Sequence, residues 1–421
     1  MLVNVSMVQY KLDSQVDDLE TILTRKKIIL DVLQNTVASA LPLLFLQLFI
    51  LPKLALALDA ETYGRSISIY SLLILIAGSF GSVLNNIRLI HQDKYNSEKL
   101  EGDFNYLALL SLACVFTSVS LSYFIVIRGS DFLEYIAIAL ASLLYMSYIY
   151  MEVGFRLSLH FGRILVGKLM LTCGFGVGYI LFRLLNQWSM IYLSAYIVAF
   201  MYVAQYSNIK NDSIRKTKLY KSTRRDFLML LFSGLLVSSG VYVDKLILFP
   251  YLGGAAVAVY YTATVLPKTL SLAIEPSTGV LLSYLSRVRK IERKHFFYFI
   301  TIVLFICFIS YFLLIKLSIP ILNFFYPAYA NATKVFIPIT AATSIVGIFS
   351  NILNALVLRY GKALWQLKLN IAYIASYIAL VYVFMLPSGI IGLCIAVLIA
   401  NIFRCMVLLI LVLQLRSKRI F

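Results

Sequence analysis

Residues 227–285 contain two apolar segments that meet at a short turn between Pro250 and Gly254. At 1.5 Å per residue, each segment is long enough to cross the roughly 30 Å hydrocarbon core of a bilayer. This pattern predicts a membrane hairpin. Apolar segments of similar length return about every 30 to 35 residues along the rest of the chain.

The composition places the chain among integral membrane proteins. Of its 421 residues, 61% are hydrophobic and 13% are charged, and the mean hydropathy is +0.88. Such a chain would not stay monomeric in water. Its length leaves room for about twelve transmembrane helices and for no soluble catalytic domain. We therefore expect an all-α polytopic membrane protein that is not an enzyme.

The net charge of +18 comes from basic residues that gather in alternate loops. The richest patches lie at 210–225 and 287–294, on the same predicted side as both ends of the chain. This asymmetry follows the positive-inside rule and predicts that both termini are cytoplasmic. It favours topology signals with some attraction to anionic lipids, and we expect no nucleic-acid partner.

A weak internal repeat divides the chain into halves. Residues 52–54 and 68–70 resemble residues 244–246 and 259–261 in sequence and spacing, although apolar hairpins can also resemble one another by chance. Repeated halves are common in secondary transporters, where the substrate site lies between them. The predicted parts are a cytoplasmic segment (1–27), a six-helix bundle (28–206), a basic cytoplasmic linker (207–226), a second six-helix bundle (227–415) and a cytoplasmic tail (416–421).

Four ionisable residues interrupt the apolar hairpin: Asp244, Lys245, Lys268 and Glu275. A charge near the bilayer centre costs at least about 2.5 kcal/mol, so such groups normally face a bundle interior or an aqueous cavity. Asp244 is predicted near the outer end of its helix, Lys268 near the middle and Glu275 in the inner half, so they need not form one site.

Lys268 and Glu275 lie two helical turns apart on nearly the same helix face. Either an interhelical ion pair or a solvated translocation cavity would explain them. Glu275 is also a candidate for ion coupling, because a helix that bends at Pro276 would change the solvation of this carboxylate.

Further cations lie within predicted spans, at Lys168 and Arg404. With Lys268 they would give an aqueous cavity a positive potential suited to an anionic substrate, unless they extend to the membrane boundary instead. The candidate substrate-binding residues are Lys268, Lys168, Arg404, Asp244 and Lys245.

The sequence contains no set of residues typical of hydrolysis, metal binding or nucleotide binding. The three histidines lie far apart, the five cysteines show no CxxC spacing, and no GxxxxGK[ST] motif is present. We therefore expect no catalytic residues, no metal and no cofactor.

Two motifs carry a resemblance to a known family. Residues 58–66 (LDAETYGRS) resemble the "lGpeeyGrys" turn of Wzx-type polysaccharide flippases, which share a superfamily with multidrug and toxin extrusion transporters and lipid II flippases. Residues 244–248, 252–253 and 259–261 are similar to the "DrlilgyflGpeavGyYs" hairpin of the same family. Asp59 replaces the usual glycine of the first motif and Pro250-Tyr251 departs from the second, so neither motif identifies the glycan.

The resemblance implies two six-helix bundles around a central cationic cavity. It implies a protein of the bacterial cytoplasmic membrane that moves undecaprenyl-diphosphate-linked oligosaccharide, such as O-antigen or capsule repeat units, to the outer leaflet by cation-coupled alternating access. Its partners would be this lipid-linked substrate and the bilayer, together with a polysaccharide polymerase and a chain-length regulator.

Two other functions compete with this interpretation. The first is a drug or small-molecule exporter of the same superfamily, an antiporter. The second is a membrane glycan polymerase or acyltransferase. Such polymerases typically need a large outer loop to hold glycans, and the longest predicted outer loop, around 318–333, is short.

Overall fold

The computed structural model describes residues 38, 40–129, 131–287, 293–360 and 363–417. The predicted cytoplasmic segment 1–27 lies outside these ranges, as do the first residues of the predicted first bundle and the end of the tail. Within the described ranges, all regular secondary structure is helical. The prediction of an all-α polytopic membrane protein is confirmed.

Helices follow one another with short connections. The first half contains η1 (Leu46–Ile50), α2 (Leu51–Ala57), α3 (Ala60–Leu73), η2 (Ile74–Gly78), α4 (Ser79–Ser97), α5 (Asp103–Ile125), α6 (Phe132–Met151), α7 (Val153–Leu157), α8 (Phe161–Leu185), α9 (Met190–Tyr206) and η3 (Asn208–Asn211). The second half contains α10 (Tyr220–Arg287), α11 (Arg293–Phe325), α12 (Pro327–Thr333), α13 (Ile337–Tyr360) and α14 (Ala363–Ser417).

Two of these helices are hairpins of two arms. The backbone leaves the helical conformation at Gly253 in α10 (φ 79°) and at Gly389 in α14 (φ 60°), a region that favours glycine. Nine helices in the described ranges are long and apolar enough to cross a membrane, and α9 is a shorter apolar helix. Counting the arms of α10 and α14 separately and adding α9, the described chain supplies twelve apolar helical segments, in agreement with the predicted number.

The connection after the first span is shorter than the sequence predicts. The polar sequence of residues 58–65 predicts a turn, whereas α3 begins at Ala60. The Asp59 carboxylate caps this helix by accepting a hydrogen bond from the Thr62 backbone N–H at 3.0 Å, and this bond lowers the pKa of Asp59. The polar side chains of this stretch therefore form the first turns of a helix, where an acidic residue such as Glu61 is favoured.

The predicted linker is tied to the first half of the chain. Asp103 at the start of α5 accepts hydrogen bonds from the Thr217 backbone N–H (2.7 Å) and from the Tyr95 hydroxyl (2.6 Å). The Asn105 side chain donates to the carbonyl oxygens of Ile209 and Asp212. The linker ends at Leu219, because α10 begins at Tyr220, earlier than the predicted start of the second bundle at residue 227.

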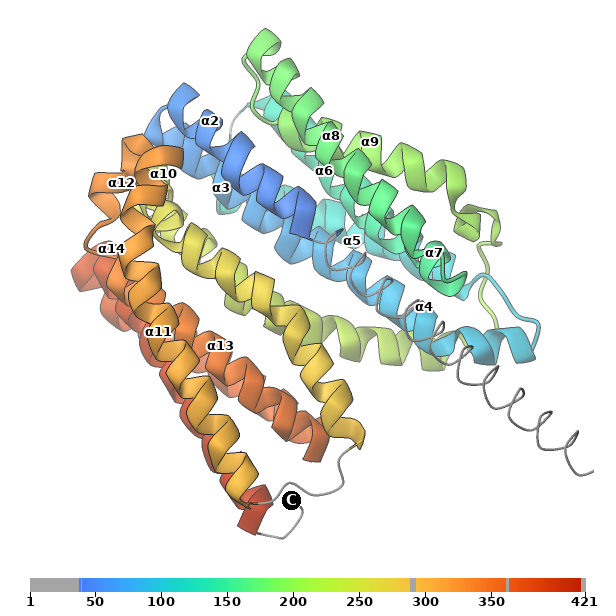
Figure 1. Cartoon of the computed structure of the whole chain (residues 1–421). Coiled ribbons are helices and arrows are strands. Elements are labelled where there is room, and N and C mark those ends of the chain that lie inside the picture. The colour runs from blue at the N-terminus through green and yellow to red at the C-terminus, as the bar shows by residue number, and fades with distance from the viewer. Residues whose placement is uncertain (1–37, 39, 130, 288–292, 361–362, 418–421) are drawn as a thin grey trace, which may run out of the picture.

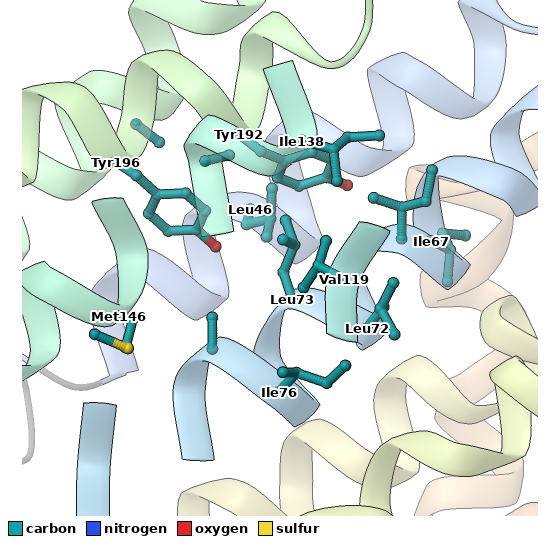
Figure 2. Packing of buried hydrophobic residues seen from close by; sticks show 14 of the residues in the cluster. Leu46, Ile67, Leu72, Leu73, Ile76, Val119, Ile138, Met146, Tyr192 and Tyr196 are labelled. Atoms are coloured by element: carbon teal, nitrogen blue, oxygen red, sulfur yellow. The ribbon is translucent and has the colours of Figure 1, made fainter. Parts of the chain in front are cut away.

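α10 lies between the helices of the first half and the other helices of the second half (Figure 1). The helices α2–α9 form the first group, and α10, α11, α13 and α14 form the second. Within the second group α10 packs against α13 and α14, and it also packs against α3, α4 and η2 of the first group. Figure 2 shows the core of the first group, where η1, α3, α6 and α9 contribute Leu46, Leu73, Ile138 and Tyr192, which are nearly or fully buried.

The two groups approach closely where α3 crosses the turn of α10. Gly64 lies so close to Gly254 that a Cβ atom added to Gly64 would lie 1.8 Å from the Gly254 carbonyl oxygen. The Glu61 carboxylate accepts hydrogen bonds from the backbone N–H groups of Gly254 (2.7 Å) and Ala255 (3.1 Å), and so caps the second arm of α10. These contacts join the two groups at the end of the molecule that carries Gly253.

We expect Gly64→Ala to destabilise the protein, because its methyl group would overlap a backbone carbonyl that has little room to move. Overpacking of this kind typically costs about 1–3 kcal/mol of unfolding free energy. Gly176→Ala is the matched control, since nothing lies within 4 Å of a Cβ atom at that position. Thermal unfolding in detergent should show a lower midpoint for Gly64→Ala and an unchanged or higher one for Gly176→Ala. Equal midpoints would contradict the close crossing.

Candidate functional site

A cavity of about 240 Å³ lies between the two groups of helices. The first half contributes Leu43, Gln47, Tyr70 and Ser71 to its wall, from residues 40–57 and α3. The rest of the wall comes from α10, α13 and α14. Residues from both halves therefore surround one space, but the second half supplies most of its polar groups.

Asp244 is the centre of an ionic cluster in this wall. Its carboxylate accepts hydrogen bonds from the Lys245 ammonium (3.0 Å), the Lys268 ammonium (2.5 Å) and the Tyr260 hydroxyl (2.8 Å). Asp244 and Lys245 are only 2% and 3% exposed, whereas the Lys268 side chain is 28% exposed. One carboxylate is thus shared by two ammonium groups, which leaves one positive charge in excess beside the cavity.

The cluster joins residues that the sequence placed at different depths. Asp244 precedes the Gly253 turn and Lys268 follows it, so they lie on opposite arms of α10. The arms run antiparallel, and the long Lys268 side chain spans the offset along their axes to reach Asp244 and the Val241 carbonyl oxygen (3.1 Å). Asp244, Lys245 and Lys268 therefore form a single cluster, although the sequence predicts different depths for Asp244 and Lys268.

The ionic partner of Lys268 in the structure is Asp244. The sequence also offered an ion pair between Lys268 and Glu275. The side chain of Glu275 lies outside the described residues, so its suggested coupling role stays a prediction.

Arg404 lines the same cavity from the second arm of α14. One of its terminal N–H₂ groups donates to the Asn351 side-chain oxygen at 3.3 Å, and its guanidinium carbon lies 5.5 Å from the centre of the Tyr373 ring. Asn370 and Asn401 also line the cavity and are each 8% exposed. A guanidinium, three amides and an aromatic ring therefore share this part of the wall.

Lys168 lies apart from the other predicted residues. Its ammonium forms an ion pair with Glu152 at 2.7 Å and lies 4.9 Å from the centre of the Tyr148 ring, within the first group of helices. The cavity-lining residues among the described part of the chain do not include it. The structure thus gathers Asp244, Lys245, Lys268 and Arg404 in one cavity and places Lys168 elsewhere.

Sequence reasoning missed several residues of the wall. Asn370 and Tyr373 repeat the three-residue spacing of Asn401 and Arg404 on the two arms of α14, and this shared spacing was a usable signal. Gln47, which lies in the π-helical turn η1, is the one polar residue of the apolar run 41–52, and this was its only signal in the sequence. Its side-chain oxygen accepts a hydrogen bond from the Thr269 hydroxyl at 2.6 Å and links the first half to α10.

The wall can hold an anion and can donate and accept hydrogen bonds. Within the described ranges, no group of three or more His, Cys, Asp or Glu side chains is placed to hold a metal ion. The fold and the cavity define a class: a multi-pass helical membrane protein in which two groups of helices enclose a charged cavity.

No protein-family model matches the chain, and no curated protein matches it in sequence. Solved structures do match in fold. An inward-facing MATE multidrug-resistance transporter of the MOP superfamily has a TM-score of 0.66 at 14% identity, covering 91% of this chain and 94% of that chain. The lipid II flippase MurJ in an inward closed conformation has a TM-score of 0.66 at 18% identity, covering 91% and 87%.

An outward-facing MATE transporter has a lower TM-score of 0.60 at 14% identity, covering 92% of this chain and 95% of that chain. The chain therefore has the fold shared by the MATE transporters and MurJ.

We expect Asp244→Asn to destabilise the protein strongly, because it leaves Lys245 buried without its carboxylate. Breaking a buried ion pair by removing one partner typically costs about 3–5 kcal/mol. The double variant Asp244→Asn with Lys245→Met should recover much of this loss, because the uncompensated ammonium is removed as well. Tyr260→Phe, which removes one hydrogen bond to the carboxylate, should cost only about 1.5–3 kcal/mol. Thermal unfolding of the wild type, the two single variants and the double variant tests this order of stability. A double variant less stable than Asp244→Asn would refute it.

Proposed function

We propose that the chain is a flippase that moves undecaprenyl-diphosphate-linked oligosaccharide across the bacterial cytoplasmic membrane by cation-coupled alternating access. The observation that carries this proposal is the cavity between the two groups of helices, where Lys245 and Lys268 share the single carboxylate of Asp244. The excess positive charge suits a diphosphate. The fold is shared with a protein named as a lipid II flippase, and the motifs of Wzx-type flippases lie in the crossing and the hairpin that shape the cavity.

Lys268 is the residue best placed to bind the diphosphate. It is the most exposed member of the ionic cluster and faces the cavity, whereas Lys245 and Asp244 are nearly inaccessible. A diphosphate that enters the cavity would compete with Asp244 for the Lys268 ammonium, and Asp244 would keep Lys245 and Tyr260 as partners. Binding then replaces one charge-assisted hydrogen bond by another and leaves no buried ammonium without an anion.

The contacts at the Gly253 turn suit a closed gate. With both termini in the cytoplasm, this turn faces the outer side of the membrane, so the Glu61 cap on Gly254 and Ala255 would close the outer end. The higher similarity to the inward-facing MATE structure than to the outward-facing one agrees with this assignment. Alternating access would move the bundle over 28–206 against the bundle over 227–415, and the linker would move with the first bundle because it is bonded to Asp103 and Asn105.

A drug exporter is the second candidate, because a MATE transporter matches the chain with the same TM-score as MurJ. The excess positive charge at the cavity disfavours cationic drugs, and lipid-linked oligosaccharide remains the better substrate on this ground. After transport, a polysaccharide polymerase and a chain-length regulator would act on the product in the outer leaflet.

We expect Lys268→Ala to abolish export of the lipid-linked oligosaccharide while the protein remains in the membrane, because the diphosphate loses its charged partner. Lys268→Arg should retain part of the activity, since the charge survives. Lys316→Ala is the matched control, an exposed lysine on α11 in the same half. Surface glycan per molecule of membrane protein is the measurement. If Lys268→Ala lowers only the amount of protein, Lys268 is structural and the proposed binding role is wrong.

Glu275 is proposed as the carrier of the coupling proton. Glu275→Gln cannot exchange a proton, so transport by this variant should no longer respond to a pH gradient imposed across reconstituted vesicles. The wild type and the Lys316→Ala variant should both respond. A response of Glu275→Gln equal to that of the wild type would exclude Glu275 from coupling.

A further inference from the structure

Arg404 differs in its ion pairing from every other buried or partly buried lysine and arginine that the structure describes. Each other lysine or arginine that is not exposed has a carboxylate within salt-bridge distance. The pairs are Arg65 with Glu134, Arg88 with Asp212, Arg156 and Lys168 with Glu152, and Lys245 and Lys268 with Asp244. Within the described ranges, Arg404 has no such partner.

The hydrogen bonds of Arg404 within the protein are few. Its Nε atom is buried and has no hydrogen-bond partner among the residues that the structure describes, and its contact with Asn351 is long, at 3.3 Å. The face of the Tyr373 ring gives some compensation, at 5.5 Å from the guanidinium carbon. A buried charge without a counter-ion raises the free energy of the folded protein, and a ligand that brings an anion into the cavity would offset this cost.

The neighbours of Arg404 are suited to a sugar. Asn370 and Asn401 are each only 8% exposed, yet both line the cavity. The Asn401 amide N–H₂ donates to the Val397 carbonyl oxygen, and Asn370 has no hydrogen-bond partner among the described residues. Amide groups that retain free donors and acceptors can bind sugar hydroxyls, and the Tyr373 ring, which lies against the Arg404 guanidinium, lines the same part of the cavity.

Arg404 and Lys268 occupy equivalent positions along their helical arms, counted from the turn of each hairpin. Each is on the second arm of a hairpin, and Lys268 follows Gly253 by the same number of residues as Arg404 follows Gly389. Both residues line the one cavity. A substrate with two anionic groups, one on its lipid-linked end and one on a sugar, could therefore contact both at once.

We propose that Arg404, together with Asn351, Asn370, Asn401 and Tyr373, binds the carboxylate of an acidic sugar in the oligosaccharide. The inference rests on the proposed function, in which Lys268 binds the diphosphate. The planar guanidinium of arginine matches a carboxylate in a bidentate geometry that lysine does not reproduce. The Arg404 site would then select substrates whose repeat unit contains a uronic acid or a similar acidic sugar.

Ligand-induced thermal stabilisation of the full chain in lipid nanodiscs tests this inference. The probes are glucuronate, glucose and inorganic pyrophosphate. Glucuronate should stabilise the wild type and glucose should not. Arg404→Gln should weaken glucuronate binding by about ten- to a hundredfold, the range of a hydrogen bond to a charged group, and leave pyrophosphate binding intact. Arg404→Lys should recover only part of the loss, and Lys368→Gln, at an exposed lysine on the same helix, should change nothing.

The two proposals fail in different ways. If glucuronate does not stabilise the wild type, or if Arg404→Gln binds it equally well, the acidic-sugar site is refuted, while pyrophosphate binding that depends on Lys268 would still support the flippase. If Lys268→Met leaves pyrophosphate binding unchanged but Arg404→Gln abolishes glucuronate binding, the sugar site stands and the diphosphate role of Lys268 fails. If Arg404→Gln weakens both probes equally, Arg404 is a general anion site and the inference is overturned.

Should Arg404→Gln fail to fold, Tyr373→Leu provides a second test. It keeps the guanidinium and removes the aromatic face, so glucuronate binding should weaken while pyrophosphate binding stays unchanged. Unchanged glucuronate binding by a folded Tyr373→Leu protein would refute the role of the ring in a sugar site.

Discussion

The close crossing of α3 and α10 at Gly64 and Gly254 is the contact on which the arrangement of the two groups of helices depends. Only glycines permit this approach, because a single Cβ atom would overlap the opposing carbonyl group. The crossing also places the Glu61 carboxylate at the start of the second arm of α10, where it caps two backbone N–H groups. A tight junction at this end leaves space further along the same helices, and the cavity between η1, α3 and the second half occupies that space.

Within the cavity, one carboxylate controls the charge. Asp244 holds two ammonium groups and a tyrosine hydroxyl, so Lys245 can be buried without leaving an unpaired charge. Its other partner, Lys268, is partly exposed and lines the cavity. Arg404 has no carboxylate partner in the described part of the chain, so the two cationic positions of the wall differ in kind. Under the proposed function, a ligand anion would replace Asp244 as the partner of Lys268 and would be the first anionic partner of Arg404.

The apolar hairpin over 227–285, the helical class and the number of apolar segments could be predicted because they depend on hydrophobicity and length, which are local properties of the chain. The position of the outer turn was less accurate, because the polar residues of 60–65 read as a loop, whereas the Asp59 cap makes them the start of α3. Four of the five predicted cavity residues lie in one cavity, and Lys168 pairs with Glu152 in the first group instead. Nothing local to Lys168 distinguishes it from Lys268, since the partner of each is on another helical segment.

The sequence by itself determined that this protein is a multi-pass helical membrane protein, where the apolar hairpin over 227–285 turns, and which residue types are too polar to face lipid. Only the tertiary structure decided which of these polar residues meet. Depth along a helix can be read from residue number, but rotation about the helix axis and the packing of distant segments cannot, and these set whether a lysine finds a carboxylate. Asp244 and Lys268 were therefore brought together, and Arg404 was left without a carboxylate among the described residues, by the packing of α10, α13 and α14 rather than by any motif.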